Sequence, residues 1–161
     1  YMTHCINSFL IKKAERFDIK GKTYFSYPNK YYYIDMGLRN ARLNYRQYDP
    51  GHIMENIIYI ELLRRGYSVD VGVVTDRRND KKSIKEIDFI VNNNDKKVYI
   101  QSSLRMDDDK KINSELDSLL LTKDFFKKII IRNDISHSYY DENGIFHISL
   151  IDFLLKKEEL F

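Results

Sequence analysis

The sequence predicts an α/β domain in which helices flank a mixed central sheet. Residues 51–65 carry apolar side chains at helical spacing, and three strand-like segments follow at 67–74, 84–91 and 97–102. A second helical stripe over residues 110–123 leads into the apolar segment 125–132. Strands joined by short turns form an antiparallel meander, and a helix crossover then adds a further strand, so the expected sheet is mixed.

Length and composition favour one globular domain of the cytoplasm. The 161 residues fall within the range of roughly 100–200 residues that is usual for a single domain. No apolar run approaches the ~18 residues that a membrane helix needs. Cys5 is the only cysteine, which excludes an internal disulfide and a zinc site built from several thiolates. We therefore expect a soluble protein of the reducing cytoplasm without a membrane partner.

Residues 1–50 are expected to form an N-terminal extension of helix and strand that packs on the core. Residues 5–14 indicate a short helix or a helix followed by a strand, 17–21 a turn, and 30–35 an aromatic strand. Asp35 is placed to cap a short helix that follows it. Nine Lys and Arg against four Asp and Glu give the extension a charge of +5, which suits either phosphate contacts or a solvated basic surface. We also expect this extension to include the linker to a preceding domain of a longer protein.

Residues 51–161 are expected to form the core. Gly66 follows the first helix at a position where a C-cap favours positive φ, and residues 92–95 (NNND) supply a hairpin turn. The isoleucines at 129–131 indicate a strand that is buried on both faces. A short strand over 144–148 and a helix over 150–155 complete the domain.

Three oxygen-bearing side chains are candidates for a functional site. Asp88 interrupts an apolar strand, where a buried carboxylate is costly unless a metal or a cation compensates its charge. The hairpin turn can bring Gln101 next to Asp88, and the helix that carries Glu55 leads into the same meander. Two simpler roles stay open at this point. Asp88 would pair with Lys85 or Lys97, and Glu55 would complement a helix dipole.

Several short segments, spread over nearly the whole chain, carry a family resemblance. They are residues 16–22 (RFDIKGK), 30–40 (KYYYIDMGLRN), 55–62 (ENIIYIEL), 65–67 (RGY), 86–89 (EIDF), 98–101 (VYIQ) and 152–155 (DFLL). Their order and spacing resemble the C-terminal domain, of unknown function, of bacterial and archaeal AAA+-type ATPases. The second half of that family is similar to PD-(D/E)xK nucleases, which implies a restriction-endonuclease-like core.

The resemblance assigns Glu55 to the helix acid of the nuclease motif, Asp88 to the hairpin aspartate, Gln101 to the second acid and Ser103 to the lysine. In such sites the carboxylates hold Mg²⁺ or Mn²⁺, which activates water, and the lysine stabilises the charged transition state. The amide of Gln101 removes one charge from this set, and Ser103 cannot supply a cation. These two departures indicate a nuclease scaffold without hydrolysis. The alternative is a relocated cation, for which Lys97 and Arg105 have the strand parity of Gln101.

Two functions follow from this resemblance. The first is a catalytically defective nuclease-like domain that binds nucleic acid or protein and belongs to the same polypeptide as an ATPase domain. The second is a Mg²⁺- or Mn²⁺-dependent DNA nuclease that uses Asp88, Glu55 and Gln101 with a relocated cation. No Gly-rich Walker-type phosphate loop occurs in the chain, so we expect no ATP hydrolysis by these residues alone.

Overall fold

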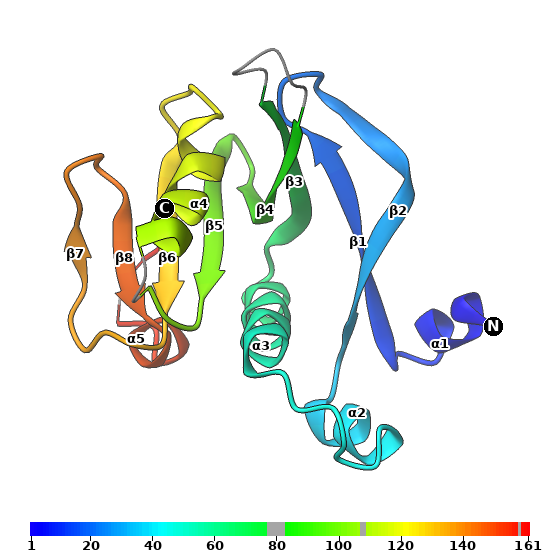
Figure 1. Cartoon of the computed structure of the whole chain (residues 1–161). Helices are drawn as coiled ribbons and strands as arrows, with labels where there is room; N and C mark the ends of the chain where they lie inside the picture. The colour runs from blue at the N-terminus through cyan, green and yellow to red at the C-terminus, as the bar shows by residue number, and fades with distance from the viewer. Residues whose placement is uncertain (77–82, 107–108, 158) are drawn as a thin grey trace.

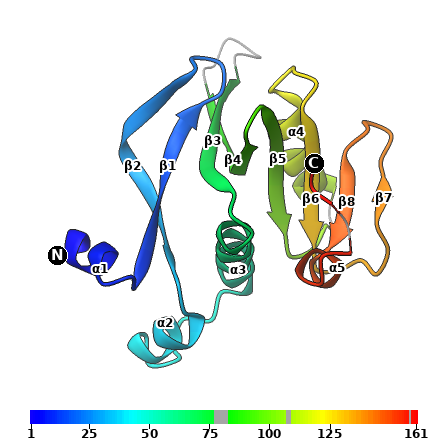
Figure 2. The same cartoon turned by 180° about the vertical axis from the view of Figure 1, so that it is seen from behind.

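A computed structural model describes the chain except for residues 77–82, 107–108 and 158. Eight strands form one sheet in the order β2-β1-β3-β4-β5-β6-β8-β7 (Figures 1 and 2). The strands are β1 (Ile11–Asp18), β2 (Thr23–Tyr33), β3 (Ser68–Asp76), β4 (Ser83–Asn93), β5 (Lys96–Ser103), β6 (Lys127–Arg132), β7 (Tyr139–Tyr140) and β8 (Phe146–Ser149). The helices are α1 (Met2–Asn7), α2 (Met36–Arg42), α3 (Pro50–Arg64), α4 (Asp109–Leu120) and α5 (Leu150–Leu154).

The sheet is mixed, as the sequence predicts. β3, β4 and β5 form an antiparallel meander, and β6 adds to β5 in parallel after the α4 crossover. One core cluster joins α3 and α5 to one face of the sheet, and a second joins α4 to the other face. We call these the α3 face and the α4 face. The α4 helix lies in front of the sheet in Figure 1 and behind it in Figure 2.

Local signals in the sequence placed several element ends correctly. Asp35 Oδ1 accepts a hydrogen bond of 2.8 Å from the Leu38 amide and caps α2. α3 ends just before Gly66, whose φ of 84° is the conformation that a helix C-terminus favours in glycine. Asn94 has a φ of 55° in the turn between β4 and β5, which confirms the predicted hairpin.

Three features differ from the sequence prediction or add to it. β1 continues through Phe17 to Asp18, where a turn was expected, because it pairs with β2 on one side and in parallel with β3 on the other. The β1–β2 hairpin of the first 50 residues therefore extends the central sheet itself. β7 was not predicted, since two residues carry no periodic signal. None of the helices in the described residues is long and apolar enough to cross a membrane.

A β-bulge in β4 decides how the centre of the sheet is built. Gly72 pairs with Ile87 and Asp70 pairs with Ile90, so Val71 alone opposes two residues of β4, Asp88 and Phe89. Ile87 and Ile90 both pack on the α4 face, whereas Phe89 packs on the α3 face. The extra residue thus turns the strand locally, which is a common way to redirect a side chain beside a functional site.

Replacing Gly72 with alanine should destabilise the fold by about 1–3 kcal/mol, as overpacking of a filled core does. A Cβ at this position would lie 2.9 Å from Ile87 Cβ and 3.1 Å from Ile90 Cγ1, next to the bulge. Urea unfolding of Gly72→Ala measures the loss. Ser68→Ala, at the exposed start of the same strand, is the control and should change stability by less than about 0.5 kcal/mol. Equal stability of the two variants would contradict this account of the bulge.

Candidate functional site

A network of charged side chains lies where β2, β4 and α3 meet. Lys30 of β2 places its ammonium 2.8 Å from Glu55 Oε1 on α3 and 2.5 Å from Glu86 Oε1 on β4. The Tyr32 hydroxyl donates a hydrogen bond of 2.6 Å to the same oxygen of Glu55. Arg16 of β1 binds the second oxygen of Glu86 at 2.7 Å. The β1–β2 hairpin, α3 and β4, which are well separated in the sequence, thus contribute to one network.

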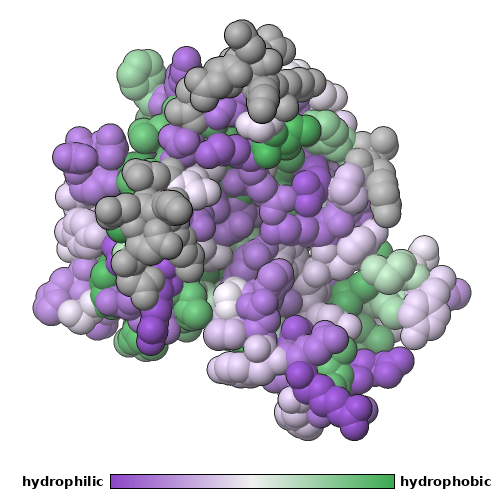
Figure 3. Space-filling view, viewed as in Figure 1, coloured by the Kyte–Doolittle hydropathy of each residue, from purple (hydrophilic) through white to green (hydrophobic). Residues whose placement is uncertain are grey.

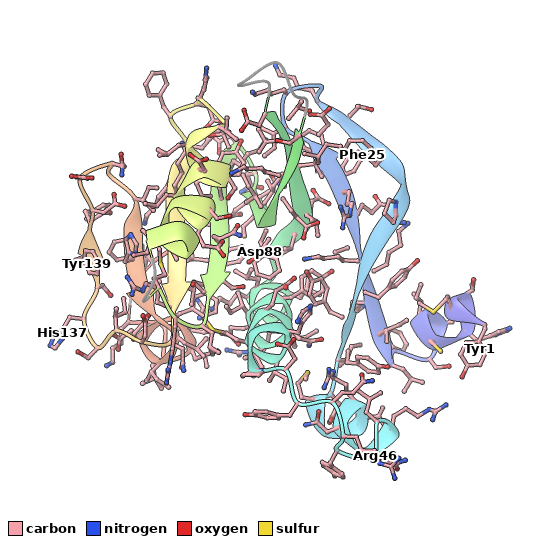
Figure 4. The ribbon with its side chains drawn as sticks, viewed as in Figure 1. Tyr1, Phe25, Arg46, Asp88, His137 and Tyr139 are labelled. Atoms are coloured by element: carbon pink, nitrogen blue, oxygen red, sulfur yellow. The ribbon has the colours of Figure 1, made fainter. Side chains whose placement is uncertain are left out.

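Asp88 is the third acid of this region and is only 9 % exposed. Its Oδ2 accepts two hydrogen bonds from Ser102, 2.8 Å from the amide and 2.7 Å from the hydroxyl. Burial, together with the nearby charge of Glu55, raises the pKa of the Asp88 carboxyl to about 7, although Lys30 and Ser102 act in the opposite direction. We call Glu55, Glu86 and Asp88 the acidic cluster. Figure 4 shows Asp88 beside β4 and β5, close to α3.

The charges of the network explain why a proton on Asp88 is favourable. The two cations, Lys30 and Arg16, are matched by Glu55 and Glu86. An ionised Asp88 adds a third negative charge in a buried place, whereas protonated Asp88 leaves the network neutral. Burial lowers the pKa of Lys30, but Glu55 and Glu86 outweigh this effect, so its pKa is raised and the ammonium stays charged.

Gln101 lies next to Asp88, as predicted, but its side chain does not add an oxygen to the acidic cluster. Gln101 Oε1 accepts the backbone amide of Asp88 at 3.1 Å, and Nε2 donates to Glu115 of α4 at 2.6 Å. The neighbouring Tyr99 packs on the α4 face and Ile100 on the α3 face, which fixes the alternation of this strand. Ser102, which stands between the two motif positions, is the residue that meets Asp88.

Ser103 also has the parity of Gln101, and its hydroxyl donates to the Arg105 carbonyl at 3.1 Å. The structure therefore brings Glu55 and Asp88 together on the α3 face but engages Gln101 and Ser103 elsewhere. The four motif positions do not converge as one set of ligands.

Neither candidate for a relocated cation belongs to the cluster. The Lys97 ammonium lies 5.5 Å and 5.4 Å from the ring centres of Phe17 and Phe126, respectively. Arg105 is exposed after the end of β5. Lys85, a partner considered for Asp88, instead forms an ion pair of 3.1 Å with Asp117.

Sequence reasoning missed Lys30, the cation that does contact the acids. The one local signal was the shared parity of Lys30 and Tyr32 in β2, which places both side chains on the same side of the strand. Their meeting with Glu55 depends on long-range pairing of β1 with β3, which no local pattern reveals.

The part of the chain that the structure describes, residues 1–76, 83–106, 109–157 and 159–161, has no group of three His, Cys, Asp or Glu side chains arranged to hold a metal ion. In the acidic cluster, the Lys30 ammonium already binds one oxygen of Glu55 and one of Glu86. A divalent cation would have to displace this ammonium and the proton that a neutral Asp88 carries.

Comparison with known proteins finds a longer relative. An uncharacterized protein of Haemophilus influenzae is similar to this chain, with 38 % identity over 159 residues, which are 97 % of this chain and 36 % of the relative. The chain thus spans little more than a third of the length of that relative. No family model matches the chain, and no solved structure matches it.

Proposed function

We propose that this chain is a nuclease-like domain without hydrolytic activity that serves a AAA+-type ATPase as a nucleic-acid-binding module. The observation that carries the proposal is the position of Lys30, whose ammonium bridges Glu55 and Glu86. A metal-dependent nuclease needs a divalent cation among such acids. Here a side chain of the protein provides the compensating charge, and the order of helix, meander, helix and strand agrees with a restriction-endonuclease-like core.

The ligand chemistry supports the loss of metal-dependent catalysis. Mg²⁺ prefers several hard oxygen ligands, usually with at least one or two carboxylates free to bind it. Burial and the neighbouring Glu55 favour the neutral form of Asp88, and the Gln101 oxygen accepts a backbone amide. A metal held by these residues would therefore have to remove the proton of Asp88, displace the Lys30 ammonium and break the hydrogen bond between Gln101 and the Asp88 amide.

Titration calorimetry with Mg²⁺ and Mn²⁺ tests this part of the proposal. At neutral pH we expect no binding heat for the wild-type chain, and the same result for Asp88→Ala. A plasmid-nicking assay with either metal should show no cleavage above that of the Asp88→Ala protein. Metal binding that is present in the wild type and lost in Asp88→Ala would contradict a purely non-catalytic domain.

The charge distribution supports nucleic acid as the partner. Residues 1–50 carry a net charge of +5 and the rest of the chain −2, so positive charge is concentrated in one third of the protein. Fluorescence anisotropy with labelled oligonucleotides should show binding at low salt that weakens as salt increases. The absence of binding even at low salt would remove this function and leave a protein partner as the alternative.

The length of the Haemophilus relative supports the ATPase part of the proposal. Only 36 % of that protein is matched by this chain, which leaves ample sequence for an ATPase domain. Expression of a full-length protein of this kind, followed by an ATPase assay with and without oligonucleotide, tests whether the two activities occur in one polypeptide.

A second candidate function is a Mg²⁺- or Mn²⁺-dependent DNA nuclease. The observation in its favour is that Glu55 and Asp88 interact on the same face, with Lys30 as a cation beside both. In that case Lys30, rather than Lys97 or Arg105, would take the role of the motif lysine. Metal-dependent nicking that is lost in both Asp88→Asn and Lys30→Met would favour the nuclease over the binding module.

A further inference from the structure

The segment from α2 to the start of α3 is unusually rich in positive and aromatic side chains. Residues 36–48 include three arginines and two tyrosines but no Asp or Glu. We call Arg39, Arg42, Tyr45, Arg46 and Tyr48 the arginine–tyrosine patch. The segment projects beyond the sheet at the bottom of Figure 1, and the same region in Figure 3 is strongly hydrophilic. Arg46 extends from it into solvent in Figure 4.

The two tyrosines and two of the three arginines of the patch leave their side chains free for binding. Tyr45 and Tyr48 are 74 % and 77 % exposed, so their rings contribute little to the core. Arg42 and Arg46 are exposed, and their side chains form no hydrogen bond or ion pair with any residue that the structure describes. Unpaired guanidinium groups next to exposed aromatic rings are the combination that binds phosphates and stacks on unpaired bases.

The backbone of the patch is held in a defined shape. Asn44 and Tyr45 both have positive φ, and the Tyr45 amide donates to the Asn40 carbonyl at 2.9 Å. Arg39 Nη1 donates to the Gln47 carbonyl at 3.3 Å and so ties the helix to the loop. The loop therefore presents its side chains at a low entropic cost of binding.

A groove beside the patch provides space for a ligand. Its volume is about 460 Å³, and its lining consists of Arg39, Arg46, Gln47, Tyr48, Asp49 and His52. Asp49 is the one acid among them, and His52 contacts both oxygens of its carboxylate. His52 Nδ1 lies 2.9 Å from Asp49 Oδ2, and the His52 backbone amide donates to Asp49 Oδ1 at 3.1 Å. The remaining charge that lines the groove is positive.

We propose that the arginine–tyrosine patch is the binding surface for single-stranded nucleic acid. This inference rests on the proposed function and names the part of the chain that performs it. The arginines would contact phosphates, and Tyr45 and Tyr48 would stack on successive unpaired bases, which a duplex does not offer. The patch follows Lys30 and Tyr32 in the sequence, whereas the β1–β2 turn precedes them. None of the patch residues belongs to the acidic cluster.

Anisotropy titrations with labelled oligothymidylate and oligouridylate of about 12 nucleotides, and with a duplex of the same length, test the proposal. Tyr45→Leu/Tyr48→Leu should weaken single-strand binding at least about tenfold, because each stacked base contributes substantially. Arg42→Gln/Arg46→Gln should reduce the slope of log affinity against log salt by about 1.4, since each phosphate contact on a single strand contributes about 0.7. The two oligonucleotides distinguish DNA from RNA as the source of the strand.

The matched control is Lys96→Gln/Lys156→Gln, which removes the same charge from two exposed positions outside the patch. It should change the affinity less than about twofold at moderate salt. Three results would each overturn the proposal. The control and the arginine variant could lose affinity equally, the tyrosine variant could keep the wild-type affinity, or polyglutamate could displace the oligonucleotide completely. In all three cases wild-type binding would remain, and the proposed function with it. No binding by the wild-type chain would instead remove the proposed function itself.

Discussion

Lys30→Met is expected to lower the free energy of unfolding by about 3 kcal/mol near pH 8, because breaking a largely buried ion pair leaves its partner charges uncompensated. Lys30 contacts both Glu55 and Glu86 and acts electrostatically on Asp88. Methionine fills similar space but carries no charge, so three carboxyl groups would share only Arg16. For a chain of this size, the melting temperature should fall by about 6–12 °C.

The loss should shrink when the pH is lowered. Lys30 is one of the groups that lower the pKa of Asp88, so its removal raises further a pKa that is already higher in the folded protein than in the unfolded chain. The folded state then binds more protons, and its stability rises as the pH falls toward about 5. Thermal melts of Lys30→Met at about pH 8 and about pH 5, each compared with wild type, measure both effects.

Lys13→Met on the same hairpin is the matched control for Lys30. Lys13 forms an ion pair of 2.7 Å with Glu15, and its side chain is 37 % exposed. Exposed pairs of this kind contribute little, so the control should melt close to the wild-type temperature. If both variants melted at the same temperature, Lys30 would not be the cation that holds the acidic cluster together.

The elements with strong local signals were predicted from the sequence, and the reason is physical. The α3 helix, which ends just before Gly66, combines apolar spacing over about four turns with a following residue that accepts positive φ. Asp35 caps α2 through a bond to an amide three residues away. The meander depends on a short turn at Asn94. Each of these features is decided by neighbouring residues.

The candidate site was predicted only in part because its geometry depends on contacts between distant segments. The contact between Asp88 and Gln101 follows from the hairpin. However, the bulge opposite Val71 and the alternation of β5 direct the Asp88 carboxylate to Ser102, whereas the Gln101 oxygen accepts the Asp88 backbone amide. Lys30 reaches the acids through the parallel pairing of β1 with β3. Neither feature has a signature in a window of ten residues.

The charge balance of the network gives the last prediction. Asp88→Asn should stabilise the protein above pH 7 and have little effect near pH 5. The folded-state pKa of Asp88 is about 7, and that of an aspartate in an unfolded chain is about 4. Between these values the folded protein holds a proton that the unfolded chain has released, so stability decreases as the pH rises through this window and then levels off. The total loss is at most about 4 kcal/mol, from three pKa units of about 1.4 kcal/mol each.

Asparagine isolates this effect because it keeps the shape of the side chain. Its Oδ1 can accept both hydrogen bonds from Ser102, and it carries no charge beside Glu55. Urea unfolding of Asp88→Asn and wild type at several pH values between about 5 and 8.5 measures the difference. The exposed turn variant Asp95→Asn should follow the wild-type curve. A stability difference for Asp88→Asn that does not change with pH would mean that Asp88 is ionised throughout, which would return it to the candidates for a metal ligand.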